Sequence, residues 1–149
     1  MRIIGIDPGK SGGLAWCVDG FMQCWPMPKT EHDIAKLIQD FSRFDDTFCF
    51  IEKVHAMPGQ GVTSMFTFGR GYGFLRGCLV SYKIPFDEVT PSTWQKALGC
   101  MSKGDKNIPK AKAQQLFPDL NITLKTADAV LIAEWGRRKR DKEQVEESY

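Results

Sequence analysis

The sequence has no long hydrophobic run. Charged residues or glycines interrupt every apolar stretch well before the ~18 to 20 residues that a transmembrane helix requires. The first residues, MRIIGID, have the pattern of a buried strand rather than of a secretion signal. We therefore expect a cytoplasmic protein with no membrane partner.

Histidine is scarce, and the cysteines do not form pairs. Only His32 and His55 offer imidazole groups, and none of the five cysteines belongs to a CxxC motif. An odd number of isolated cysteines is typical of reduced thiols. These features argue against both a disulfide framework and a structural zinc site.

The excess of positive charge is also small. A formal net charge of +2 does not by itself identify a nucleic-acid partner. The positive side chains do form two clusters, one of Lys103, Lys106, Lys110 and Lys112 and one of Arg137, Arg138, Lys139 and Arg140. Each cluster is either a basic surface for a polyanion or an ordinary solvated face, and charge alone leaves both interpretations open.

What is present fits one globular domain. The chain has 149 residues, of which 42% are hydrophobic and 26% charged, and it contains no repeat or low-complexity linker. We expect a single domain over residues 1–149, in which about 137–149 form a frayed, charged tail.

Five strands are expected from apolar and β-branched runs bounded by turn residues. They cover 2–7, 13–18, about 21–25, 47–52 and 86–89. Helical spacing and capping residues predict helices at about 30–41, 62–82, 90–98, 110–117 and from 126 onward, with a loop at 104–109. This order predicts an α/β fold with a mixed sheet.

Three acidic residues stand at the ends of these elements, in otherwise apolar surroundings. Asp7 ends the first strand, Glu52 ends the fourth, and Asp128 lies in the first turn of the last helix. If these ends meet at one edge of the sheet, the carboxylates repel each other unless a cation joins them. Carboxylate oxygens suit Mg²⁺ or Mn²⁺, which can support phosphodiester hydrolysis. Taken singly, each acid is also explained by a turn or by the helix dipole.

Four segments of the chain have the character of motifs. They are the first strand with its turn, IGIDPGKSGGLAW, and the strand that ends in Glu52 with the helix after it, FIEKVHAMPGQGVTSMFTFGRGYG. A strand-to-helix segment, VTPSTWQKALG, and the helix that carries Asp128, TADAVLIAEWG, follow. In this order the four segments resemble the motifs of RuvC-type Holliday-junction resolvases, in the compact style of phage and prophage sequences. The resemblance implies an RNase H-like fold with a five-stranded mixed sheet flanked by helices. It also implies a homodimer, two Mg²⁺ or Mn²⁺ ions per site, and paired incision of four-way DNA junctions.

Asp7, Glu52 and Asp128 match the acidic positions of that family. A fourth ligand, Asp or His, usually stands three residues before the last aspartate, where this sequence has Lys125. An ammonium group cannot bind a metal ion. Lys125 is thus either a catalytic contact to the scissile phosphate or a surface lysine.

The resemblance also indicates where DNA would bind. The loop after Glu52 would face the junction centre, with His55, followed by Met57, at the position of an aromatic wedge and with Phe66 and Phe68 further on. His55 is thus either a wedge that stacks on a base or a loop residue with no special role. Phosphate contacts are expected from basic residues, since backbone charge supplies most nucleic-acid affinity. The expected DNA-binding residues are Lys10, Lys53, His55, Arg70, Lys103, Lys106, Lys110 and Lys112.

Gly69, Gly73 and Gly77 recur every four residues on the predicted helix 62–82. This spacing lays a smooth groove along one helical face, and the resemblance favours a two-fold dimer interface there. Spacing alone favours the other interpretation, in which the groove seats the helix on its own sheet.

Other functions remain as alternatives. The DPG segment also resembles the phosphate loop of actin-like kinases, but one domain of this length cannot clamp a nucleotide between two lobes, so no nucleotide cofactor is expected. A related nuclease for flaps, other branched forms or RNA-containing duplexes, and a junction-binding module without activity, are the nearer alternatives.

Overall fold

The computed structural model describes residues 1–55 and 59–149. Met57, part of the expected wedge loop, lies outside the described residues. A five-stranded sheet has the order β3-β2-β1-β4-β5 and is mixed. Strands β1 (Arg2–Asp7), β2 (Gly13–Val18) and β3 (Phe21–Pro26) form the antiparallel meander. Strands β4 (Thr47–Glu52) and β5 (Phe86–Val89) continue the sheet in parallel to β1.

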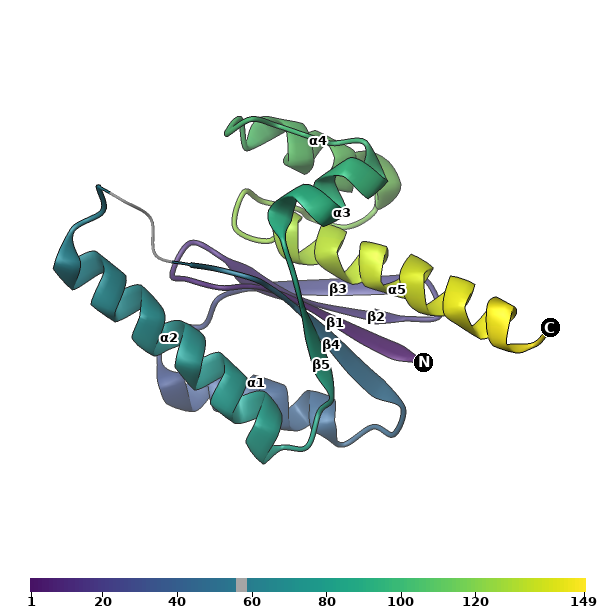
Figure 1. Cartoon of the computed structure of the whole chain (residues 1–149), viewed down its shortest axis with the longest axis horizontal. Helices are drawn as coiled ribbons and strands as arrows, with labels where there is room; N and C mark the ends of the chain where they lie inside the picture. Colours follow the sequence, from purple (N-terminus) through teal and green to yellow (C-terminus); the bar gives the residue numbers. More distant parts are fainter. Residues whose placement is uncertain (56–58) are drawn as a thin grey trace.

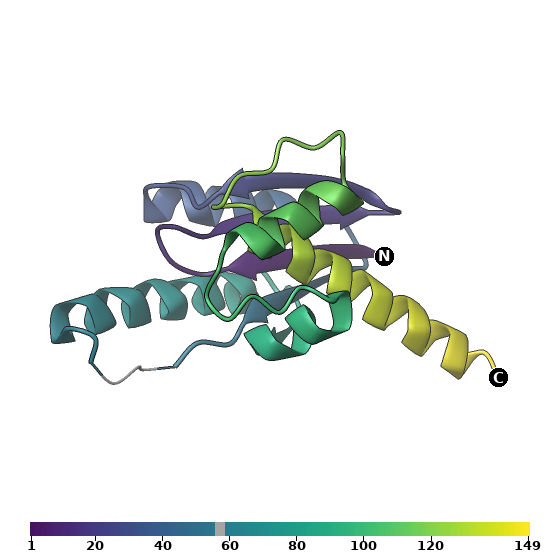
Figure 2. The same cartoon turned by 90° about the horizontal axis from the view of Figure 1, so that it is seen from above.

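Helices cover both faces of this sheet (Figure 1). Helices α1 (Glu31–Ser42) and α2 (Val62–Ser81) lie on one face. Helix α5 (Ala127–Glu147) crosses the other face, with α3 (Pro91–Leu98) and α4 (Asn107–Leu116) on either side of its first turns (Figure 2). The expected α/β fold with a mixed five-stranded sheet is therefore confirmed. Within the described residues, no helix is both long and apolar enough to span a membrane.

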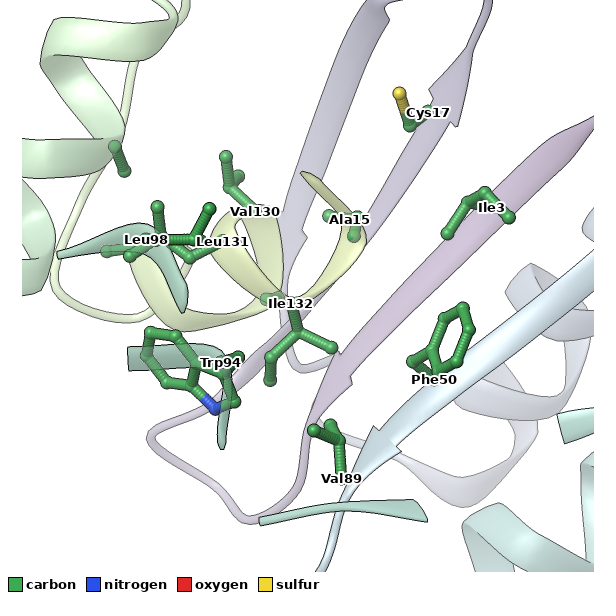
Figure 3. Close-up of a cluster of buried hydrophobic side chains, with 14 of the residues drawn as sticks. Ile3, Ala15, Cys17, Phe50, Val89, Trp94, Leu98, Val130, Leu131 and Ile132 are labelled. Atoms are coloured by element: carbon green, nitrogen blue, oxygen red, sulfur yellow. The ribbon is translucent and has the colours of Figure 1, made fainter. Parts of the chain in front are cut away.

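The alternation of side chains along β1 and β4 divides the core between the two faces. Ile3 and Phe50 point toward α5, whereas Ile4, Ile6 and Ile51 point toward α1 and α2. Figure 3 shows the cluster on the α5 face, in which Ile132 of α5 lies between Trp94 of α3 and the strands.

Helix α4 begins earlier than the sequence predicted. The segment 104–109 was expected to be a loop because of Gly104 and Pro109, but the helix starts at Asn107. Proline is tolerated in the first turn of a helix, where its missing N–H has no helical partner. The Asp105 carboxylate accepts a hydrogen bond from the Asn107 backbone N–H at 3.0 Å and so helps to start the helix.

The expected frayed tail at 137–149 is also wrong, since α5 continues to Glu147. Glu134 is buried and accepts hydrogen bonds from Arg137 (Nε, 2.7 Å) and Arg138 (Nε, 2.9 Å). Lys139 and Arg140 both reach Glu143. Ion pairs three and four residues apart stabilise a helix. They also pair the four cations of the second basic cluster with three carboxylates, Glu134, Asp141 and Glu143, which offset most of its charge.

Candidate metal centre

The strand register places Asp7 and Glu52 side by side. In the parallel pair of β1 and β4, Ile6 lies opposite Ile51, so the next residue on each strand is one of these acids. Both continue the alternation of Ile3 and Phe50, which puts them on the face that α5 covers. The two carboxylates therefore share one end and one face of the sheet.

Helix α5 brings the third acid to the same place because it lies very close to β1. A Cβ atom on Gly5 would overlap the carbonyl oxygen of Ala129 and lie 2.6 Å from the Ala133 backbone nitrogen. A Cβ atom on Gly136 would overlap the Phe50 ring. The absence of side chains at these two glycines lets the helix rest on the sheet, and Asp128 then reaches Asp7 and Glu52.

The three carboxylates form a compact cluster. One oxygen from each of Asp7, Glu52 and Asp128 lies within 4.8 Å of the others, and all three side chains are partly buried. Among the described residues, this is the one gathering of His, Cys, Asp or Glu side chains tight enough to hold a metal ion. Three hard oxygen donors fit a divalent cation such as Mg²⁺ or Mn²⁺ and fit soft metals poorly. The convergence expected from the sequence is present.

Without a cation, this cluster favours protonation. Burial raises the pKa of Asp7 to about 8, the charges of Glu52 and Asp128 add to the rise, and Lys106 opposes it. Burial likewise raises the pKa of Glu52 to about 7, although a hydrogen bond from Trp94 acts against the rise. Burial raises the pKa of Asp128, and Lys106 again opposes the shift. A folded site that keeps three carboxylates close together despite their mutual repulsion favours the binding of positive charge, either as protons or as a cation.

The sequence did not reveal the role of Trp94. Its indole Nε1–H donates a hydrogen bond of 2.9 Å to Oε2 of Glu52. Trp94 is fully buried beneath α5, so its ring is held by the core while its N–H reaches the carboxylate. The sequence placed Trp94 on a helix after β5, but a contact between residues 42 positions apart depends on the tertiary packing of α3.

Of the basic residues expected near the site, Lys106 is the one whose charge acts on all three carboxyls. Lys103 and Lys106 line a hollow of about 400 Å³ that also reaches Asp128. Ser92 and Gln95 from α3 add polar groups to its wall. The hollow thus joins the carboxylate cluster to a positively charged, hydrogen-bonding surface.

The other expected DNA-binding residues lie in three places. Lys10, Lys53 and His55 are exposed in segments that follow the ends of β1 and β4, beside the cluster. Arg70 is exposed on α2. Lys110 and Lys112 are half-buried on α4.

Lys125 occupies a different setting. Its side chain is exposed, and with Lys110 it lines a second hollow, of about 900 Å³, between β3 and the segment that precedes α5. Its backbone carbonyl lies against Gly13, where a Cβ atom would come within 2.7 Å. The catalytic role suggested for Lys125 stays a prediction.

The glycine groove on α2 faces solvent. A Cβ atom on Gly69, Gly73 or Gly77 would meet nothing within 4 Å. The groove therefore does not seat α2 on its own sheet, which was one of the two interpretations of the spacing. Phe66, on the same helix, is 70% exposed.

Comparisons with known proteins agree on the fold. No protein-family model matches the chain, and no curated protein matches it by sequence. The structure of Thermus thermophilus RuvC is similar over 93% of this chain and 96% of that one, with a TM-score of 0.63 and 16% identity. The structure of T. thermophilus RuvC in complex with a Holliday junction substrate is similar over the same shares, with a TM-score of 0.63 and 15% identity. The chain therefore has the RNase H-like α/β fold seen in RuvC.

Proposed function

We propose that this protein is a divalent-cation-dependent endonuclease that resolves four-way DNA junctions by paired phosphodiester hydrolysis. The observation that carries the proposal is the convergence of Asp7, Glu52 and Asp128 at one end of the sheet, with one oxygen of each within 4.8 Å of the others. Three acids from three separate elements are costly to assemble unless a cation uses them.

In this proposal, the acidic residues bind the cation and the lysines bind the DNA backbone. Asp7, Glu52 and Asp128 would hold Mg²⁺ or Mn²⁺, and such an ion supplies an activated water and stabilises the leaving oxygen of a phosphodiester. Lys103 and Lys106, at the hollow beside Asp128, would hold the neighbouring DNA phosphates. Lys10 and Lys53, which are exposed in the segments that follow β1 and β4, would also contact the DNA backbone.

The choice of four-way junctions rests on fold and motif order together. The similar RuvC structure holds a Holliday junction, and the four sequence segments resemble that family in order. We include two cations per site in the proposal, with the second held largely by substrate, because Lys125 supplies no ligand. If that is so, Lys125→Asp lowers the Mg²⁺ concentration needed for half-maximal cleavage, and an unchanged requirement speaks against it.

We further propose a homodimer formed through the solvent-facing groove of α2. Resolution of a two-fold symmetric junction needs two symmetry-related incisions, which a dimer supplies. Gly73→Leu should leave the protein folded, since Gly73 is exposed and nothing lies within 4 Å of an added Cβ atom, but should make it monomeric in light scattering. Gly71 is equally open but lies off the Gly69–Gly73–Gly77 line, so Gly71→Leu is the matched control and should stay dimeric. A folded Gly73→Leu protein that remains dimeric would remove this interface.

The experiment that tests the function is cleavage of a synthetic four-way junction with Mg²⁺, Mn²⁺ or EDTA. Asp7→Asn keeps the shape of the side chain but removes its charge, so it should abolish cleavage and leave junction binding in EDTA largely intact. Flap, RNA–DNA duplex and linear DNA substrates run in parallel identify the alternative nucleases. Junction binding without cleavage in either metal would instead indicate a non-catalytic binding module.

A further inference from the structure

Glu52 depends on a partner that comes from a different part of the chain. A carboxylate has two oxygens that can accept several hydrogen bonds or bind a cation. In this structure, Trp94 Nε1–H donates to Oε2 of Glu52 at 2.9 Å, which leaves accepting capacity on the carboxylate for a further ligand. The indole N–H only donates and does not titrate or bind a metal, so it directs the carboxylate without competing for the ion.

The geometry of α3 makes this donor rigid. Val89 pairs with Glu52 at the end of β5, and α3 begins two residues later at Pro91. Pro91 stands in the first turn of α3, and Gly99 ends the helix in the left-handed conformation, with φ of 69°. Trp94 lies one turn into this short helix, and its indole reaches the Glu52 side chain at the end of β4.

The core fixes the indole ring as well as the helix. Trp94 has no exposed surface and packs in the cluster on the α5 face. Figure 3 shows its ring close to Leu98 and Ile132. A buried indole N–H needs a hydrogen-bond partner, and here that partner is a carboxylate of the candidate metal centre rather than a backbone carbonyl.

We propose that Trp94 is a positioning residue, which holds the Glu52 carboxylate in the orientation that binds the divalent cation. This inference rests on the proposed function for the identity of the site but concerns cation binding rather than cleavage. Groups that hydrogen-bond metal ligands orient them, and their loss weakens metal affinity roughly 10- to 100-fold.

The test is a direct Mn²⁺ titration of the whole protein, followed by calorimetry or by the EPR signal of free Mn²⁺. Trp94→Phe keeps an aromatic ring and removes the N–H, so we expect roughly tenfold weaker Mn²⁺ binding. Trp16→Phe is the matched control, because Trp16 is also largely buried but stacks on Phe41 at the opposite face of the sheet. Trp16→Phe should leave Mn²⁺ affinity unchanged. A folded Trp94→Phe protein with the affinity of the control would overturn the proposal.

A double-mutant cycle separates positioning from general damage to the site. If Trp94 acts through Glu52, Trp94→Phe should weaken Mn²⁺ binding in the wild-type background and have little further effect on Glu52→Gln. An equal loss in both backgrounds would mean that Trp94 only supports the fold, and the proposal would fail.

A second measurement does not depend on the folding of Trp94→Phe. The sequence has four tryptophans, so a ¹H–¹⁵N spectrum contains four indole signals, which single substitutions of the other three assign by elimination. The Trp94 signal should move when Mg²⁺ is added and should stop responding in Glu52→Gln. An indole signal unaffected by Mg²⁺ in a protein that binds the ion contradicts the proposal.

Different results would refute the proposed nuclease function and the positioning role of Trp94. A wild type that binds Mn²⁺ but cuts no junction, flap or duplex overturns the proposed nuclease, whereas the titrations still decide the role of Trp94. A wild type that binds no Mn²⁺ overturns both.

Discussion

The two faces of the sheet are built differently. The face toward α1 and α2 is filled by large side chains, among them Ile4 and Ile6 from β1 and the stacked rings of Trp16 and Phe41, whose centroids lie 4.8 Å apart. On the other face, α5 lies very close to the sheet. Gly5 on the strand and Gly136 on the helix permit this, because a Cβ atom at either position would collide with its neighbours.

The burial of apolar side chains and the positioning of the acidic residues therefore depend on different features of the two faces. Large apolar side chains supply much of the hydrophobic free energy, and a core of this kind tolerates small changes in shape. At Gly5 the strand backbone lies against the helix backbone, and at Gly136 the helix backbone lies against the Phe50 ring. These contacts fix where the helix lies and therefore where Asp128 stands. We infer that the stability of the protein depends on both faces, whereas the candidate metal centre depends on the face toward α5.

The largest expected effect comes from adding a side chain at the place where α5 lies against β1. Gly5→Ala places a methyl group against backbone atoms of Ala129 and Ala133 that cannot rotate away. We expect a loss of roughly 3 kcal/mol in the free energy of unfolding, the upper part of the usual range for overpacking. Mn²⁺ binding should weaken as well, because α5 must shift and carries Asp128 with it. Urea unfolding and Mn²⁺ titration measure both effects, and a Gly5→Ala protein of native stability and affinity would refute the close-approach argument.

The next effect concerns the charge of the cluster and depends on pH. In the metal-free protein the pKa of Asp7 is about 8, against 3.8 ordinarily, so the folded state holds its proton more tightly than the unfolded state. The stability that this provides is complete below pH 4 and is lost as the pH rises through 8. Asp7→Asn removes that dependence. One pKa unit corresponds to about 1.4 kcal/mol, so the full rise in the pKa of Asp7 from 3.8 to about 8 would amount to about 6 kcal/mol. Because the Asp7 side chain is only partly buried, solvent screens its charge, and in EDTA at pH 8 we expect Asp7→Asn to raise the free energy of unfolding by roughly 1 to 3 kcal/mol.

Urea unfolding at pH 4 and pH 8 shows directly whether Asp7→Asn raises or lowers the free energy of unfolding at each pH. The advantage of Asp7→Asn should be present at pH 8, small at pH 4, and reduced at pH 8 when Mg²⁺ stabilises the wild type. An advantage of equal size at both pH values would show that the substitution acts through packing and not through the buried charge.

A smaller effect is expected on the opposite face. Ile4 is fully buried toward α1 and α2, and Ile4→Val removes one methylene group from that cluster. Such a change typically costs about 1 kcal/mol. Because this face does not position the carboxylates, Mn²⁺ affinity should remain that of the wild type. A clear loss of affinity would mean that the two faces are not separable.

The smallest effect is a gain in stability. Gly71 lies in the exposed part of α2, with nothing within 4 Å of an added Cβ atom. Gly71→Ala should stabilise the protein by roughly 0.5 to 1 kcal/mol, the difference in helix propensity between the two residues. Thermal unfolding measures the gain, and a destabilised variant would indicate an unrecognised contact at this position.

Much of this architecture could be predicted from the sequence, because its signals are local. The Asp19-Gly20 turn, the Thr30 cap that accepts from the Asp33 backbone N–H, and the apolar runs define most elements. The three acids could be predicted to meet because each stands at the end of an element. Parallel strands then bring Asp7 and Glu52 to one edge.

What could not be predicted depends on tertiary geometry. The bond from Trp94 to Glu52 requires the phase of α3 relative to β4, which the local sequence does not set. The length of α5 was misjudged because a run of charges at 137–149 is typical of a solvated tail, whereas its ion pairs three and four residues apart hold it helical. Whether Lys106 or Lys125 stands closer to the acids also depended on where the segments before α4 and α5 pack.

The most direct test of the account is a crystal structure of the protein with Mn²⁺, using the anomalous scattering of the ion. We expect a strong anomalous peak coordinated by oxygens of Asp7, Glu52 and Asp128, and no peak at that place in Asp7→Asn crystals grown with the same Mn²⁺ concentration. Ordered wild-type carboxylates with no peak between them, or Mn²⁺ bound only elsewhere on the molecule, would contradict the assignment of this cluster as a metal centre.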